Sequence, residues 1–188
     1  GMILREYGRV DIANLFTLSD SHILPNVDMS KEAVSLMRHE EDKSVGDAYG
    51  FNFHDAGLPD SEIRGVAWDD YWAEIDGDLV DASEQFIRNV VTDNEADLYI
   101  PSAFGLHPDH LIAHIAGIRA LGSLGIQSWF LYGDQPYYSL PTPVRNELHD
   151  HLSISRRNAI PFSATQKKPM RAAYPSQLST ERVDRMAQ

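Results

Sequence analysis

The stretch Asp97-Leu-Tyr-Ile-Pro-Ser-Ala-Phe-Gly-Leu-His-Pro-Asp-His110 carries the strongest indication of the fold. Its first five residues form a short apolar run that is typical of a buried strand, and a Ser-Ala-Phe-Gly-Leu loop follows. Pro108 suits the first turn of a helix, where its missing N–H is of no consequence, and the apolar pattern continues to about residue 124. The sequence therefore predicts a strand, a loop and a helix in succession.

Similar units flank this stretch on both sides. The patterns predict strands at 10–18 and 127–132 and helices at 30–45, with Ser30 as N-cap, and at 80–91. Residues 51–65 are rich in Gly, Asp and Pro and predict a loop with at most a short strand, and further helical segments are expected at 144–149, 164–173 and 180–186. This alternation predicts an α/β fold with three layers, in which helices cover both faces of a mostly parallel, Rossmann-like sheet.

Composition narrows the possible classes of protein. The 188 residues, 43% of them hydrophobic, are enough for one sizeable core, so a single domain over 1–188 is expected. A net charge of −12 would repel nucleic acids and anionic membrane surfaces, and no apolar run approaches the roughly 18 residues of a membrane span. The absence of cysteine excludes disulfides and thiolate metal sites, leaving histidine and carboxylates as ligands. These features favour a cytoplasmic protein.

The tetrapeptide His107-Pro108-Asp109-His110 is the main candidate for chemistry. It places two imidazoles and a carboxylate at the positive end of a helix. There one histidine can ligate zinc, and the other can point at the same metal-bound species without ligating the metal. An ordinary alternative is that Asp109 only interacts with the helix start and His107 only precedes a proline. His114 lies one turn beyond His110, but its apolar neighbours favour a core-edge histidine over a ligand.

At these residues the sequence resembles a known family, the LmbE/PIG-L de-N-acetylases. Residues 99–110 look like the second signature of that family, and Arg38-His-Glu-Glu-Asp42 is similar to its Arg-x-x-Glu-Asp helix. Residues 57–64 resemble its Asp-containing loop, residues 132–137 a Tyr-Glu-Asp-x-Pro-Tyr segment, and residues 168–177 its Lys-to-Ser-Gln tail. Five matches in the same order are more specific than any one of them.

The resemblance implies a zinc-dependent hydrolase that removes the acetyl group from an N-acetylated sugar or a glycolipid-like amide. By this resemblance His110 is a zinc ligand, and His107 stabilises the oxyanion or protonates the leaving amine. Asp109 would orient a histidine, and Arg38 and Asp60 would hold hydroxyl groups of the substrate. The chemistry is coherent, since zinc polarises a carbonyl and activates water while a nearby imidazole supplies a proton.

Local roles remain open for the two expected substrate-binding residues. Arg38 could form an ion pair with Glu41 or Asp42 across one helical turn. Asp60 could stabilise the turn that follows Pro59.

The sequence departs from the family at its amino-terminal side. Family members begin with a strand that carries a His-x-Asp-Asp motif with two metal ligands and the general base, whereas residues 3–9 contain neither histidine nor aspartate. The first strand–helix unit of the family is therefore expected to be missing, and His22 and Asp20 imitate its ligands poorly.

Three explanations of this departure compete. The sequence could be a fragment of an active enzyme whose gene start was placed too far downstream. It could be a short, metal-free relative that binds carbohydrate without hydrolysing it. A second subunit could also complete the site, and because a shortened sheet exposes an edge, a homo-oligomer is plausible.

Overall fold

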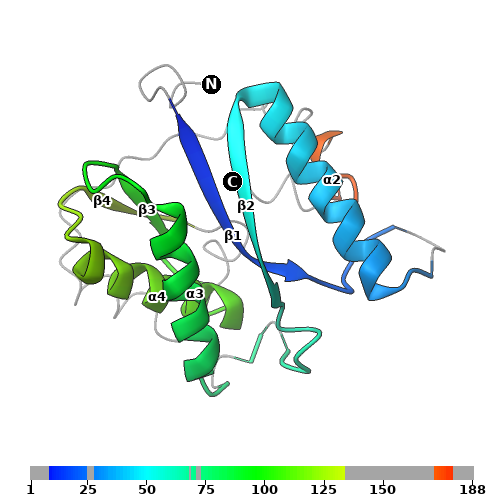
Figure 1. The fold of residues 1–188 in the computed structure, drawn as a ribbon. Helices are drawn as coiled ribbons and strands as arrows, with labels where there is room; N and C mark the ends of the chain where they lie inside the picture. The colour runs from blue at the N-terminus through cyan, green and yellow to red at the C-terminus, as the bar shows by residue number, and fades with distance from the viewer. Residues whose placement is uncertain (1–8, 25–27, 68, 71–72, 134–171, 180–188) are drawn as a thin grey trace.

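The computed structural model describes residues 9–24, 28–67, 69–70, 73–133 and 172–179 (Figure 1). Strands and helices alternate along the chain. The order is β1 (Val10–Leu18), α2 (Lys31–Tyr49), β2 (Phe51–Pro59), α3 (Gly77–Val90), β3 (Leu98–Pro101), α4 (Pro108–Leu124) and β4 (Trp129–Tyr132). This order confirms the predicted α/β class. The helices expected at 144–149 and 180–186, and nearly all of that at 164–173, lie outside the described residues.

The strands pair in parallel, as the alternation with helices predicted. β1 pairs with β2 from Val10 opposite Phe51, and β3 pairs with β4 from Leu98 opposite Trp129. Figure 1 shows β1 between β2 and β3. Within the described ranges no hydrogen-bonded ladder joins the two pairs, so the strands form two two-stranded sheets and not one continuous sheet.

A loop with at most a short strand was predicted over residues 51–65, whereas residues 51–59 form the nine-residue strand β2. Its polar side chains, which weakened the strand pattern, have partners in the folded chain: Asp55 lies 2.6 Å from Nδ1 of His39, and His54 lies 2.8 Å from Asp11 on β1. Backbone pairing with β1 and these contacts outweigh the low strand propensity of Asn, Asp, Gly and Pro. Strand propensity by itself could not reveal these partners.

The helix ends follow from local chemistry. The Ser30 hydroxyl accepts a hydrogen bond from the Ala33 amide at 3.3 Å, which confirms the predicted N-cap of α2. Gly50 ends α2 and Gly125 ends α4, both with left-handed φ angles that a glycine adopts without strain. α3 begins before the predicted residue 80, because the Asp76 carboxylate caps the amides of the first turn.

The core lies between β1 and the helix pair α3–α4. Leu15 of β1 packs with Val80 and Ile87 of α3 and with a run of small and branched residues on α4, namely Ile112, Ala116 and Ala120. α4 also lies close against β3, since a Cβ atom placed on Gly117 would be 2.8 Å from Cγ2 of Ile100. This packing fixes the amino-terminal end of α4 beside the carboxyl end of β3.

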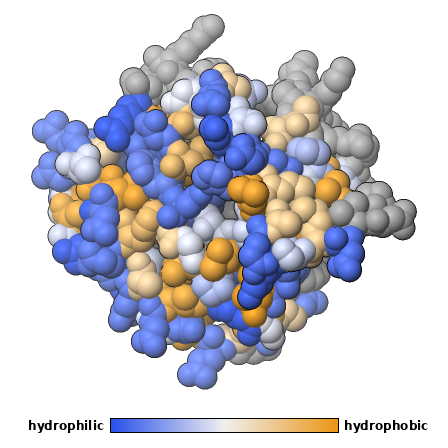
Figure 2. Space-filling model, turned by 45° about the vertical axis from the view of Figure 1, so that its right-hand side comes forward, coloured by the Kyte–Doolittle hydropathy of each residue, from blue (hydrophilic) through white to orange (hydrophobic). Residues whose placement is uncertain are grey.

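The surface is mixed in character. Figure 2 shows hydrophilic residues over much of the visible face, with hydrophobic residues in separate patches. Among the helices of the described residues, none is both long and apolar enough to cross a membrane.

Candidate functional site

The loop between β3 and α4 holds two residues in the left-handed region. Ala103 has a φ of 55° and Leu106 a φ of 56°, and the Leu106 amide donates to the Ala103 carbonyl at 2.8 Å. This conformation costs a residue with a Cβ on the order of 1–2 kcal/mol. Both side chains are buried, at 3% and 9% exposure, so their packing stabilises this strained turn. The turn places His107 at the start of α4.

His107 and His110 lie side by side at the first turn of α4. Their ring centroids are 4.9 Å apart. His107 is buried and caps the helix, since its Nδ1 accepts the Asp109 amide N–H at 3.3 Å. When Nδ1 accepts, the neutral imidazole carries its proton on Nε2. The structure therefore brings the two predicted histidines together and assigns a proton-bearing nitrogen to one of them.

Asp109 is buried and held from the loop that follows β2. One carboxylate oxygen accepts the Ser61 amide at 3.1 Å, and the other pairs with the Arg64 guanidinium. Burial raises the pKa of Asp109, against the lowering effect of the Ser61 amide and of Arg64. The expected role for Asp109 was to orient a histidine. Its carboxylate contacts the loop that carries Ser61 and Arg64, and its expected role in orienting a histidine stays a prediction.

Arg64 connects two of the expected site residues. Besides its pair with Asp109, its Nε donates to the backbone carbonyl of Asp60 at 3.3 Å, and its guanidinium lies 5.6 Å from the centre of the Phe16 ring. Sequence reasoning did not select Arg64 or Ser61. Both lie in the 57–64 segment that resembled the family loop, but a contact with a residue 45 positions away has no local signature.

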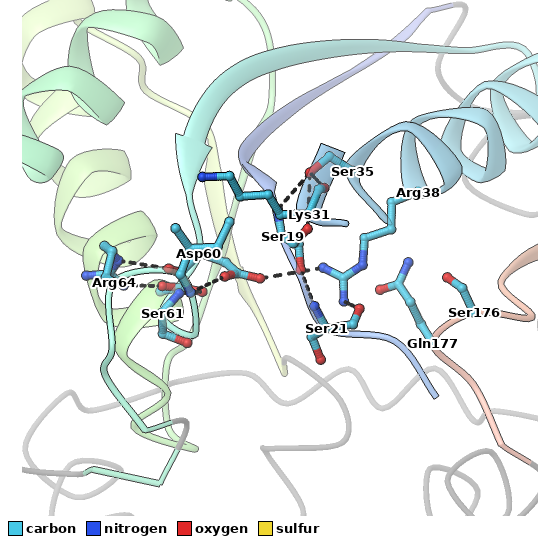
Figure 3. A network of polar contacts seen from close by, with 12 residues as sticks. Ser19, Ser21, Lys31, Ser35, Arg38, Asp60, Ser61, Arg64, Ser176 and Gln177 are labelled. Atoms are coloured by element: carbon cyan, nitrogen blue, oxygen red, sulfur yellow. Dashed lines mark hydrogen bonds and ion pairs between the residues drawn. The ribbon is translucent and has the colours of Figure 1, made fainter. Parts of the chain in front are cut away.

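Arg38 and Asp60, the two expected substrate-binding residues, lie beside one another. Figure 3 shows Arg38 reaching from α2 towards Asp60 and Ser21. Its Nη1 lies 3.8 Å from the Asp60 carboxylate, and its Nη2 donates to the Ser21 carbonyl at 2.9 Å. Asp60 also stabilises the turn that it begins, because its Oδ1 accepts the Ile63 amide N–H at 3.0 Å.

Glu41 is not the ion-pair partner of Arg38. Its carboxylate binds Ser176 twice, accepting the backbone amide at 2.8 Å and the hydroxyl at 2.7 Å. Both residues are buried, and they lie 135 positions apart. This contact holds residues 172–179 against α2.

The described residues do not supply the ligands that zinc needs. A catalytic zinc ordinarily takes three protein ligands. No group of three or more histidines and acidic residues in the described ranges could hold a metal ion. The Asp109 carboxylate binds Arg64 and the Ser61 amide. Nδ1 of His114 lies 2.8 Å from the Pro101 carbonyl, which is typical of a histidine at the edge of the core. Within this part of the chain, His110 lacks the other members of a zinc site.

His22 and Asp20 do not complete such a site. Within the described ranges, neither belongs to a group of three or more histidines and acidic residues that could hold a metal ion. Nδ1 of His22 is buried and has no hydrogen-bond partner in the described part of the structure.

Comparison with known proteins supports the fold. No protein-family model matches the sequence, and no curated protein matches it. A solved structure with a similar fold is described as "The crystal structure of antimicrobial reagent A40926 pseudoaglycone deacetylase Dbv21". The similarity has a TM-score of 0.52 at 18% sequence identity and covers 92% of this chain and 83% of that chain. The protein therefore has an α/β fold that resembles the fold of a deacetylase.

Proposed function

We propose that this protein is a relative of the LmbE/PIG-L de-N-acetylases that hydrolyses the acetyl amide of an N-acetylated sugar or a glycolipid-like compound. The observation that carries the proposal is that Asp109 and Arg64 connect the His107–His110 pair to the Arg38–Asp60 pair. His107 and His110 lie together at the start of α4, and Asp109 between them in sequence pairs with Arg64, which bonds the backbone of Asp60. The fold similarity to a deacetylase agrees with this reaction class.

The site residues have distinct tasks in this proposal. His107, with its proton on Nε2, donates a hydrogen bond to the oxygen that becomes negative. Arg38 and Asp60, one a donor and the other an acceptor, bind hydroxyl groups of the substrate. Asp109 and Arg64 are positioning residues that fix the histidine-bearing turn against the loop that carries Asp60.

Zinc has no assigned step here, because the described residues do not form a three-ligand site. That observation favours a second candidate function, in which the protein binds an N-acetylated sugar through Arg38 and Asp60 without hydrolysing it. The two candidates differ in one product, acetate.

Acetate release is the direct test. Purified protein is incubated with N-acetyl-D-glucosamine, with and without added zinc, and acetate is measured by a coupled assay. Replacing His107 by Ala is expected to lower the rate by about 100-fold or more, the ordinary effect of losing one hydrogen-bond donor to the oxyanion. His114→Ala is the matched control and is expected to keep the rate, since its Nδ1 contacts the Pro101 carbonyl and its ring is no part of the proposed machinery.

Bound metal is measured in parallel by elemental analysis of the wild type and His110→Ala after equal exposure to zinc. Acetate release that needs zinc, with zinc lost in the variant, supports the hydrolase. No acetate and no zinc, together with saturable binding of N-acetyl-D-glucosamine, supports the metal-free binding protein and overturns hydrolysis.

A further inference from the structure

We propose that residues 172–179, called the carboxyl-terminal segment below, position Arg38 by occupying the two carboxylates that compete for its guanidinium. These carboxylates belong to Glu41 and Asp42, which follow Arg38 on the same helix, α2. The inference rests on the proposed function for what Arg38 binds, whereas the position of Arg38 is a property of the free protein.

Glu41 and Asp42 are the partners that Arg38 would be expected to take within α2. Side chains three or four residues apart lie on one face of a helix, and opposite charges at these spacings attract one another. The Arg38 guanidinium instead turns to other segments: Nη2 donates to the Ser21 carbonyl at 2.9 Å, and Nη1 lies 3.8 Å from the Asp60 carboxylate. Other groups must therefore satisfy the two nearer carboxylates.

The carboxyl-terminal segment supplies the donors to Glu41. The buried Glu41 carboxylate accepts the Ser176 amide at 2.8 Å, the Ser176 hydroxyl at 2.7 Å and the side-chain amide of Gln177 at 3.3 Å. Hydrogen bonds to an ionised group are stronger than those between neutral groups. Three of them stabilise the Glu41 charge without a cation.

Asp42 is occupied in the same way. Its partly buried carboxylate accepts the Tyr174 hydroxyl and, at 2.7 Å, the Asn14 side-chain amide. Tyr174 and Arg38 line one pocket beside α2, so the donor and the competing cation approach Asp42 from the same region. A partly buried carboxylate that lost its donor would attract the nearest cation, which is Arg38.

The same segment also holds the acceptor that Arg38 uses. The Ser176 carbonyl accepts the Ile23 amide at 2.9 Å, and Ile23 belongs to the same loop as Ser21. Figure 3 shows the Arg38 guanidinium between Ser21 and the carboxyl-terminal segment. Ser176 thus acts on Arg38 from two sides, by occupying a competitor and by fixing the loop that carries its acceptor.

The Nε–H group of Arg38 provides a direct measurement of this position. Nε is buried and has no hydrogen-bond partner among the described residues, so burial alone protects its proton from exchange with water. An Arg38 side chain that turned back along α2 would leave this buried position, and its Nε proton would then exchange faster. The exchange rate is measured by NMR on the ¹⁵N-labelled full chain.

Two pairs of variants test the inference independently. Ser176→Ala removes the hydroxyl that donates to Glu41, and Tyr174→Phe is its counterpart for Asp42. Each is expected to accelerate exchange of the Arg38 Nε proton about tenfold, as for the loss of one hydrogen bond to a charged group. Adding Glu41→Gln to the first variant, or Asp42→Asn to the second, removes the competing charge. Each addition is expected to bring the rate back to within about twofold of the wild type.

Gly117→Ala is the matched structural control. It destabilises the protein by overpacking α4 against Ile100, but it changes no contact of Arg38 or of the carboxyl-terminal segment. The exchange rate of the Arg38 Nε proton is therefore expected to stay at the wild-type value. This control separates positioning of Arg38 from a general loss of stability.

Kinetics supply a second measurement where acetate is released. Ser176→Ala is expected to raise KM for N-acetyl-D-glucosamine about tenfold and to keep kcat within about twofold, because Arg38 binds the substrate and takes no part in bond breaking. An equal fall in kcat would contradict a role limited to positioning a binding residue.

Three results of the exchange experiment would overturn the inference: an unchanged rate in folded Ser176→Ala and Tyr174→Phe proteins, the same acceleration in Gly117→Ala, or no recovery when the competing carboxylate is neutralised. The exchange measurement needs no substrate. Absence of acetate release together with the expected exchange rates would therefore count against the proposed function and leave the positioning of Arg38 intact.

Discussion

Arg64 and Asp109 form an ion pair that joins the loop after β2 to the first turn of α4. The two side chains are only 13% and 10% exposed, and the residues are 45 positions apart in the sequence. The pair therefore links the segment that carries Asp60 to the turn that carries His107.

Arg64→Ala is expected to lower the free energy of unfolding by about 3 kcal/mol or more, because it leaves the Asp109 carboxylate buried without its cation. Urea denaturation measures the change. The control is Arg119→Ala, which removes an ion pair with Asp81 in which the side chains are 50% and 72% exposed. That exposed pair is expected to contribute about 0–1 kcal/mol. Equal effects of the two substitutions would contradict the buried ion pair.

Ser176→Ala tests the contact that holds the carboxyl-terminal segment. It removes the hydroxyl that donates to Glu41 at 2.7 Å, and a buried hydrogen bond to a charged group contributes about 1.5–3 kcal/mol. We expect destabilisation of that size, with faster hydrogen exchange of the Ser176 amide. Ser123→Ala, which removes an exposed hydrogen bond to Glu84, serves as the control and is expected to be near neutral. An unchanged exchange rate at residue 176 would show that the segment is held by other contacts.

Replacing two glycines of α4 by alanine is expected to have opposite effects on the stability of the protein. Alanine at position 117 would place its Cβ 2.8 Å from Cγ2 of Ile100, and overpacking of this kind costs about 1–3 kcal/mol. Alanine at position 122 would meet nothing within 4 Å and should stabilise the helix by up to about 1 kcal/mol. Melting temperatures of Gly117→Ala and Gly122→Ala measure both effects. Stabilisation by Gly117→Ala would contradict the close approach of α4 to β3.

Asp42 makes the stability of the protein depend on pH. Burial raises its pKa above the ordinary value of 3.8, the nearby Asp55 and Glu41 carboxylates raise it further, and hydrogen bonds from Tyr174 and Asn14 act in the other direction. The folded state therefore binds the proton more tightly than the unfolded state. The resulting contribution to stability is complete below about pH 3.8 and is lost as the pH rises through the folded pKa.

Asp42→Asn removes this titration. Relative to the wild type, the variant is expected to gain stability between about pH 4 and pH 7, as measured by urea denaturation at each pH. Asp11→Asn should show the reverse trend: burial tends to raise the Asp11 pKa, but hydrogen bonds from His54 and Arg9 lower it overall. Stability from Asp11 is present above the unfolded pKa and is lost as the pH falls, so its removal costs most near neutral pH. Parallel pH profiles of the two variants would contradict these assignments.

Local signals in the sequence predicted much of the fold. Pro108 at the start of α4, Ser30 at the start of α2 and the apolar run before Ser102 are each explained by residues a few positions away. The alternation of strands and helices then gave the parallel pairing, because parallel neighbours need a crossover between them. The candidate residues His107, Asp109 and His110 were found for the same reason, since they share one helical turn.

The tertiary structure alone decided the features that join distant segments. β2 was missed because its polar residues become favourable only beside Asp11 and His39. Arg64 was missed because its partner, Asp109, is 45 positions away along the chain. Propensity, capping and periodicity act over a few residues and can be read in the sequence, whereas the partner of a buried charge depends on which segments meet when the chain folds.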